Sequence, residues 1–188
     1  MSDTLGDVPD VRIVEREDLS SNELDDILAW LEVAFDDGPW RPEHWQDIGA
    51  GPHFMIDDEH GLAAHLCLVP ISVQAGDVDL RAIYVEDVAT RADRRGQGLG
   101  TALLRAAAPT IERESELGLL ATGSHGFYAR LGWVPWRGPL SVTEADGSTT
   151  RTTEEDGDVL ALFVPGTPAG ISPDLPLVRP RRDPEEAW

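Results

Sequence analysis

The sequence predicts a single α/β (α+β) domain built on a mixed sheet. Segments with strand periodicity and segments with helical periodicity alternate on either side of a glycine-rich turn at residues 95–100. The chain has 188 residues, of which 41% are hydrophobic, and this is enough for one core of ordinary size. No Ser/Gly-rich linker or internal repeat divides the chain, so we expect residues 1–188 to form one domain.

In the N-terminal half we expect a strand, two helices and a meander of three strands. Ser20 and Glu23 match a capping box, and the apolar residues after them recur at helical spacing as far as Phe35. The Asp37-Gly38-Pro39 segment should end that helix, and Pro42 fits the first turn of another. The expected elements are a strand at 11–16, helices at 20–35 and 41–47, and strands at 53–56, 61–73 and 79–90.

The C-terminal half should hold two helices, three strands and a tail. The helical pattern from Gly98 to Ser115 contains Pro109, which we expect to kink or interrupt the helix. Residues 165–188 contain six prolines and little periodicity, so this tail is expected to be either extended along the body or mobile. The other expected elements are strands at 117–122, 140–143 and 158–164, a short helix at 124–131 stopped by Gly132, and a polar hairpin or loop at 144–157.

The chain is strongly acidic. Its formal net charge is −20, and all 15 of its cationic side chains are arginine. Binding to nucleic acid or to an anionic membrane requires clustered positive charge, so neither partner is expected. An acidic surface suits cationic small molecules, but it is also typical of a protein adapted to a salt-rich cytosol, and we favour salt adaptation as the main cause.

Cysteine and histidine usage excludes several kinds of site. The one cysteine, Cys67, excludes a disulfide framework and a cysteine-based zinc cluster. The five histidines have no ligand spacing, so no metal site is expected. The first residues lack the features of a signal peptide, which predicts a cytoplasmic protein. Exposed tryptophans such as Trp133 or Trp136 are candidates for a homodimer interface.

The strongest local signal is the turn Arg-Arg-Gly-Gln-Gly-Leu-Gly-Thr at residues 94–101, which follows a strand and opens a helix. Glycines let successive backbone N–H groups converge on an anion, and the N-terminus of the helix adds partial positive charge. The segment therefore predicts a site for a phosphate or pyrophosphate. It is not a Walker loop, because no Lys-Ser/Thr follows, and its glycine spacing differs from that of a Rossmann fingerprint.

Two adjacent carboxylates, Glu86 and Asp87, interrupt an apolar strand just before this turn. In a regular strand they would face opposite sides, so one of them would point inward. An unpaired buried carboxylate is costly, and a role as a general base or in cation binding is a good reason to retain one. The alternative is a strand end at which both side chains reach water.

Tyr128 lies in a Gly-Phe-Tyr-Ala-Arg-Leu-Gly-Trp block at residues 126–133. We expect this block to form a short helix after an inner strand. A phenol there can donate a proton to a leaving group. The alternative is an aromatic core residue whose hydroxyl group binds a backbone carbonyl.

Together, these three segments resemble the GCN5-related N-acetyltransferases (GNAT) over residues 11–164. In that family the Arg-x-x-Gly-x-Gly pattern, here Arg95 to Gly100, binds the pyrophosphate of acetyl-CoA. The resemblance implies the GNAT fold, in which helices flank a mixed sheet with splayed strands, and it implies acetyl-CoA as the cofactor. The cofactor-binding residues that it implies are Val88, Ala89, Thr90, Arg95, Gly96, Gln97, Gly98, Leu99, Gly100 and Thr101.

A narrower resemblance extends through the tail to Trp188. The chain is similar to aminoglycoside 2′-N-acetyltransferases at residues 84–86, 91–93, 132–136 and 150–152, and in ending with an acidic segment and tryptophan. This resemblance implies transfer of an acetyl group to the 2′-amino group of an aminoglycoside, and so a role in antibiotic resistance. Those relatives carry glycine after the strand glutamate, where this chain has Asp87.

The resemblance also assigns roles to single residues. Glu86 would be the general base, acting directly or through water, and Tyr128 would protonate the departing thiolate of CoA. The N–H of Val88 would polarise the thioester carbonyl. The carboxylate of Trp188 would reach the ammonium groups of the substrate. The substrate-binding residues implied in this way are Asp37, Glu43, Glu86, Asp87, Asp156, Glu186 and Trp188.

Two other functions remain open from the sequence. The chain has the features of a GNAT enzyme for a different amine, such as a polyamine, an amino acid or a peptide N-terminus. A non-catalytic acyl-CoA-binding module is also conceivable, although the intact turn at 95–100 and Tyr128 disfavour it.

Overall fold

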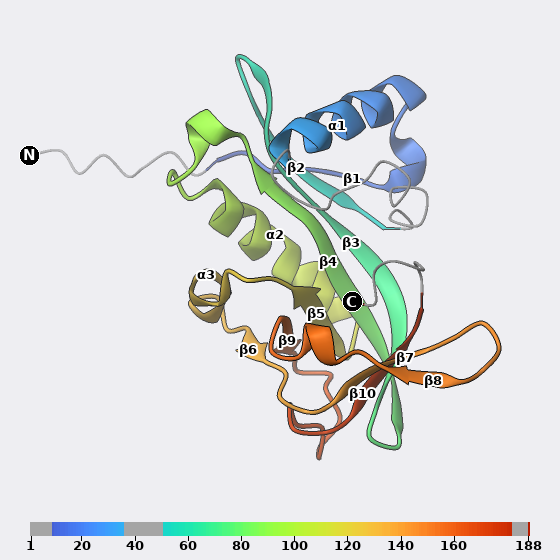
Figure 1. Cartoon of the computed structure of the whole chain (residues 1–188). Helices are drawn as coiled ribbons and strands as arrows, with labels where there is room; N and C mark the ends of the chain where they lie inside the picture. The colour runs from blue at the N-terminus through green and yellow to red at the C-terminus, as the bar shows by residue number, and fades with distance from the viewer. Residues whose placement is uncertain (1–8, 36–50, 182–187) are drawn as a thin grey trace, which may run out of the picture.

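The computed structural model describes residues 9–35, 51–181 and 188. Within these residues, ten strands form one mixed sheet with the central order β6-β9-β5-β4-β3-β10-β7-β8, and β1 and β2 extend it from one edge of β3 (Figure 1). The predicted fold class is confirmed. The elements are β1 (Arg12–Val14), α1 (Ser21–Ala34), β2 (His53–Asp58), β3 (Gly61–Ala75), β4 (Val78–Thr90), α2 (Leu99–Glu114), β5 (Leu117–Ala121), α3 (His125–Ala129), β6 (Val134–Pro135), β7 (Leu140–Thr143), β8 (Thr149–Arg151), β9 (Val159–Phe163) and β10 (Leu177–Pro180).

Both faces of the sheet are buried, and β3 shows how the sequence achieves this. Its side chains alternate between the two faces. Cys67, Val69 and Val73 belong to the core that α1 covers, whereas Leu66 and Leu68 belong to the core beneath α2. The long helix and the N-terminal helix therefore lie on opposite faces of the same strands (Figure 1).

The two main helices begin where their sequences indicate. Ser20 accepts a hydrogen bond from the Glu23 N–H, and the Glu23 carboxylate accepts one from the Ser20 N–H, so the predicted capping box is present. The second helix, α2, continues through Pro109, so the expected interruption is wrong. Burial of Ala107 and Ile111 on either side offsets the hydrogen bond that proline cannot make.

The sheet divides at its centre. β4 and β5 run parallel and pair from Ala82 to Tyr84 on β4, opposite Leu117 to Leu119 on β5. β4 then continues to Thr90 beyond this pairing. The carboxyl-terminal half of β4 is thus released from β5, which leaves room between the two strands for a ligand.

A β-bulge lies in the released half of β4. Cys67 pairs with Glu86 and His65 pairs with Ala89, so two residues on β4 oppose the single Leu66 on β3. Asp87 within the bulge has φ +53°, the left-handed region that a non-glycine residue seldom adopts. The bulge turns the backbone of β4 where the predicted carboxylates lie.

The tail contributes a strand that the sequence did not predict. β10 lies between β3 and β7, antiparallel to the first and parallel to the second. The extended alternative is therefore confirmed for residues 177–180. The predicted polar segment at 144–157 forms a hairpin in part, because β8 pairs with β7.

The prediction that Trp133 and Trp136 are exposed is wrong. Trp133 is buried in the core beneath α2, and Trp136 is buried in the opposite core, where its indole N–H donates to the Leu175 carbonyl at 2.8 Å. The short strand β6 returns the chain onto β9, and this places the two indoles inward on different faces. Neither indole is available for a homodimer interface.

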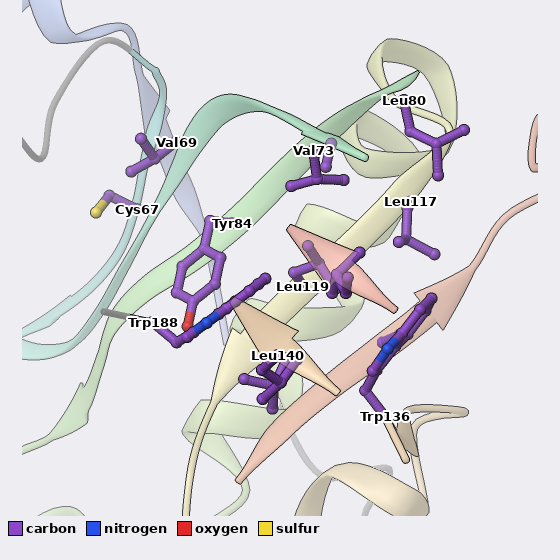
Figure 2. Close-up of a cluster of buried hydrophobic side chains, with 14 of the residues drawn as sticks. Cys67, Val69, Val73, Leu80, Tyr84, Leu117, Leu119, Trp136, Leu140 and Trp188 are labelled. Atoms are coloured by element: carbon purple, nitrogen blue, oxygen red, sulfur yellow. The ribbon is translucent and has the colours of Figure 1, made fainter. Parts of the chain in front are cut away.

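Figure 2 shows one of the two cores, with Trp136 at one end and Trp188 beside Tyr84 near the centre. The last residue of the chain is therefore part of the hydrophobic packing. In the described ranges, no helix has the length and apolar character needed to cross a membrane.

Candidate functional site

The predicted phosphate turn leads into the N-terminus of α2. Gly96 and Gly98 have φ +77° and +83°, and Gly98 is the residue that precedes the helix. The first helical hydrogen bond runs from the Ala102 N–H to the Gly98 carbonyl, so the amides of residues 99–101 have no acceptor within the helix. These three N–H groups and the positive end of the helix dipole favour an anion.

An arginine–aspartate cluster fixes the base of this turn. Asp58 at the end of β2 binds both Arg91, at 2.6 Å, and Arg94. The hydrogen bond from Arg91, with help from the His60 N–H, lowers the pKa of Asp58 to about 2. Gln97 accepts a hydrogen bond from Arg94, so its side chain braces the turn.

A cavity of about 560 Å³, which we call the turn cavity, lies in front of this segment. A Cβ atom added to Gly96 or Gly98 would meet nothing within 4 Å, so the backbone is open to a ligand there. Arg95 and Arg130 add positive charge. The donor set fits a pyrophosphate. The predicted cofactor-binding residues that line this cavity are Val88, Thr90, Arg95, Gly96, Gly98, Leu99, Gly100 and Thr101.

The remaining two predicted cofactor-binding residues have other surroundings. Ala89 is buried and pairs with His65 on β3, and the Gln97 amide donates to the Asp93 carbonyl. Neither residue lines the turn cavity.

A second cavity of about 300 Å³, which we call the strand cavity, occupies the gap between β4 and β5. It brings together Glu86, Asp87 and Tyr128 from the predicted site, and Trp188 forms part of its wall. Val88 and Tyr128 are among the residues that line both cavities, so the two cavities meet there. A ligand held at the turn can therefore extend toward the two carboxylates.

Tyr128 lies at this junction. Its ring packs edge-on against Phe127 and Trp133, and the residue is buried. Burial raises the pKa of Tyr128 to about 12, because the phenolate loses hydration. The phenol thus keeps its proton at neutral pH and is suited to donating it.

Trp188 is held by a hydrogen bond and by a cation–π contact. Its indole N–H donates to the Thr152 hydroxyl at 3.1 Å. The guanidinium of Arg179 lies 5.5 Å from the Trp188 ring and 5.1 Å from the Tyr84 ring. Arg179 thus links the Trp188 ring to Tyr84 of β4, and Trp188 lines the strand cavity.

Not every predicted substrate-binding residue reaches the strand cavity. Asp156 binds Arg151 at 2.6 Å and lines neither the strand cavity nor the turn cavity. Asp37, Glu43 and Glu186, like the predicted helix at 41–47, lie outside the described residues.

Several residues around the cavities were not predicted. Phe35 lines both cavities, although its position in the helical pattern indicated only a core residue. Thr122 lines both as well, and its place at the end of the expected strand 117–122 was an available signal. Nothing in the sequence distinguished Arg179 from the other arginines.

Two buried histidines lie behind the bulge. His53 Nδ1 is 3.0 Å from His65 Nε2, and His65 Nδ1 is 3.2 Å from the Asp87 carbonyl oxygen. Burial is the main cause that lowers the pKa of His53 to about 4 and that of His65 to about 3. The positive charge of Arg16 adds to the shift at His53, and His53 adds to that at His65.

Acid should destabilise the fold through these two histidines. In the unfolded chain both titrate near 6.5, so below that pH the unfolded state binds more protons. Their contribution is fully present above pH 6.5 and is lost as the pH falls through 4 and 3. From pH 7 to pH 5, each should lower the free energy of unfolding by about 2 kcal/mol. Urea unfolding at both pH values would measure this, and an equal pH dependence in wild type and in His53→Asn would contradict it.

Comparisons with known proteins all find acetyltransferases. Residues 16–135 match the model of the acetyltransferase (GNAT) domain family. An aminoglycoside 2′-N-acetyltransferase of Mycolicibacterium fortuitum is 36% identical over 165 residues, which are 87% of this chain and 83% of that protein.

Solved structures give the same fold at lower identity. The N-acetyltransferase YhbS of Escherichia coli, in complex with CoA, has a TM-score of 0.66 and 14% identity, covering 91% of this chain and 89% of its own. A GNAT acetyltransferase of Brucella melitensis, in complex with acetyl-CoA, has a TM-score of 0.52 and 16% identity, covering 80% of this chain and 94% of its own.

Proposed function

Because this chain belongs to the GNAT acetyltransferase family, we propose that it transfers the acetyl group of acetyl-CoA to the 2′-amino group of an aminoglycoside-like aminosugar. That the chain is an acetyltransferase using acetyl-CoA follows from the family. The identity of the acceptor amine is what we propose. It is supported by the relative that is 36% identical and by the carboxylates of the strand cavity.

One observation carries the proposal. The strand cavity holds a potential base, Glu86, and a proton donor, Tyr128, and it joins the turn cavity at Val88 and Tyr128. An amine beside Glu86 and a thioester reaching from the turn would therefore meet between a proton acceptor and a proton donor. Acyl transfer from a thioester to an ammonium group needs both.

The proposed chemistry assigns one step to each residue. Glu86 accepts a proton from the substrate ammonium, directly or through water, and this frees the amine lone pair for attack. The N–H of Val88 donates to the carbonyl oxygen on which negative charge develops. Tyr128 gives its proton to the sulfur as the carbon–sulfur bond breaks. The acetyl group is supplied by acetyl-CoA, bound by the amides and arginines of the turn cavity.

Charge supports a cationic substrate. Glu86 and Asp87 both line the strand cavity, and we propose that they bind ammonium groups, with the carboxylate of Trp188 beside them. The net charge of −20 concentrates cations around the protein as a whole. Asp87 also favours a second candidate, a smaller polyamine or peptide amine, because it fills space where the similar family has glycine.

The amine class is tested by thiol release from acetyl-CoA, measured at low and at molar KCl. The decisive pair is an aminoglycoside with a 2′-amino group and its counterpart with a 2′-hydroxyl group. Turnover of the first alone supports the proposal. Turnover of simple polyamines alone would support the second candidate instead. Equal turnover of both aminoglycosides would show that the 2′-amino group is not the site of acetylation.

Deleting Trp188 should raise KM for the 2′-amino aminoglycoside more than tenfold, because the strand cavity loses the side chain that forms one wall and the proposed substrate-binding carboxylate is displaced. Acetyl-CoA affinity should not change, since Trp188 does not line the turn cavity. Steady-state kinetics and calorimetric titration of acetyl-CoA would measure the two effects.

Trp188→Phe is the matched control for this deletion. It keeps a ring and the carboxylate and removes the hydrogen bond to Thr152, so a change of a few-fold is expected. An unchanged KM in the deletion variant would exclude Trp188 from substrate binding and favour the second candidate.

A further inference from the structure

The two buried histidines behind the bulge form a hydrogen-bonded chain that ends on the backbone of the proposed site. His53 of β2 and His65 of β3 are both fully buried. The hydrogen bonds join His53 Nδ1 to His65 Nε2, and His65 Nδ1 to the Asp87 carbonyl oxygen. Neither histidine lines the strand cavity or the turn cavity, so neither is placed to touch the reactants.

The Asp87 carbonyl determines which ring nitrogens of the two histidines carry protons. A carbonyl oxygen only accepts hydrogen bonds, so the proton of His65 must be on Nδ1. In the neutral ring, Nε2 of His65 is then an acceptor, and His53 must donate to it from Nδ1. Each histidine is thus held in one tautomer by its neighbour.

The accepting carbonyl belongs to the peptide group that carries the proposed oxyanion donor. The Asp87 C=O and the Val88 N–H are parts of one planar unit, and the described residues contain no cis peptide bond. In a trans peptide the two groups point in opposite directions. The bond from His65 on one side therefore turns the Val88 N–H toward the other, and Val88 lines both cavities whereas His65 lines neither.

This peptide group needs an external support. Asp87 is at φ +53° in a bulge, where the regular ladder of hydrogen bonds between β3 and β4 is interrupted. Residues in sparsely populated backbone regions persist only where their surroundings hold them. The contact of the Cys67 thiol with the Glu86 carbonyl, at 3.8 Å, is long and weak by comparison.

We propose that His65 is a positioning residue for acetyl transfer, which orients the Asp87–Val88 peptide so that the Val88 N–H faces the thioester, and that His53, by donating to Nε2, holds the His65 ring in the orientation required. The inference rests on the oxyanion role of Val88 in the proposed function. The inference assigns the two buried histidines a role in the reaction as well as in packing.

Two pairs of variants test the proposal in the full chain, with acetyl-CoA and the 2′-amino aminoglycoside. His65→Leu removes the donor and should lower kcat at least tenfold, whereas His65→Asn keeps an N–H donor near the position of Nδ1 and should recover most of it. His53→Leu keeps the Nδ1 donor of His65 but removes the hydrogen bond to Nε2 that holds its ring, so kcat should fall again, and His53→Asn should restore it. Acetyl-CoA affinity should stay within about threefold, because the turn at 95–101 is untouched.

Leu80→Ala separates positioning from loss of stability. Leu80 is buried at the end of β4 that lies away from Asp87, so this control should lower the melting temperature while kcat per folded site is retained. If His65→Leu behaves like Leu80→Ala, with kcat unchanged per acetyl-CoA-binding site, the histidines are structural only and the proposal is wrong.

Nitrogen-15 NMR of the histidine rings tests the proposed tautomer of His65 without any substrate. The proposal requires a protonated Nδ1 and an unprotonated Nε2 on His65 in wild type, with a shifted Nε2 resonance in His53→Leu, because the hydrogen bond to that nitrogen is lost. The opposite tautomer in wild type would overturn the proposal even if acetyl transfer is confirmed. The expected tautomer with no aminoglycoside turnover would instead count against the proposed substrate.

Discussion

Replacing Tyr128 with phenylalanine should lower kcat about a hundredfold or more, because the departing thiolate loses its proposed proton donor. The ring would still fill its place against Phe127 and Trp133, so the fold and the turn cavity should be preserved. Acetyl-CoA affinity should therefore change little. Steady-state kinetics and direct binding of acetyl-CoA would measure both effects.

The acyl donor provides the control for this variant. A thioester whose thiol is much more acidic than CoA needs no protonation to leave, so the deficit of Tyr128→Phe should shrink with such a donor. Burial holds the pKa of Tyr128 at about 12, so in wild type the phenol should remain protonated well above pH 9. Equal kcat in wild type and Tyr128→Phe would remove Tyr128 from the mechanism.

Replacing Glu86 with glutamine should lower kcat/KM for the amine by about 10²-fold to 10³-fold. The amide matches the carboxylate in shape but accepts no proton from the substrate ammonium. The acid limb of the pH profile should also flatten, because in wild type that limb reports deprotonation of the base. Acetyl-CoA affinity should be unchanged, since Glu86 lines the strand cavity and not the turn cavity.

Asp87→Asn is the matched comparison for Glu86→Gln. The neighbouring carboxylate lines the same cavity, so its loss should raise KM for a cationic substrate. It should leave the acid limb in place, because Asp87 is not the proposed base. A flattened acid limb in Asp87→Asn, with a normal profile in Glu86→Gln, would make Asp87 the general base and leave Glu86 a role in substrate binding only.

Local chemistry made much of this fold predictable. The capping box at Ser20 and Glu23 marked the start of α1, because the signal lies in residues that contact each other along the chain. The turn before α2 was equally readable, since its glycines are needed for φ +77° at Gly96 and +83° at Gly98. Alternating apolar residues placed the long central strands within a few residues of their observed ends.

What the sequence did not reveal depends on distant contacts. β10 is four residues long among prolines, and only its place between β3 and β7 makes it a strand. The burial of Trp133 and Trp136 follows from the return of β6 onto β9, which no local pattern records. The release of β4 from β5 is likewise a property of the pairing and not of either segment alone.

The candidate site divides in the same way. Glu86, Tyr128 and the glycine turn could be identified from residue type and order, and the structure brings them to two adjoining cavities. Arg179 and the pair His53 and His65 could not, because each has a partner more than ten residues away in sequence, which for Arg179 is Tyr84.

The most direct test of the account is the structure of the product. Wild-type protein would be incubated with acetyl-CoA and a 2′-amino aminoglycoside, and NMR would locate the new amide while released thiol is counted. The account predicts one thiol per acetyl group and an amide on the 2′ nitrogen. An amide on another nitrogen of the same antibiotic would contradict the proposed position, and no release of thiol with this substrate would contradict the proposed substrate class.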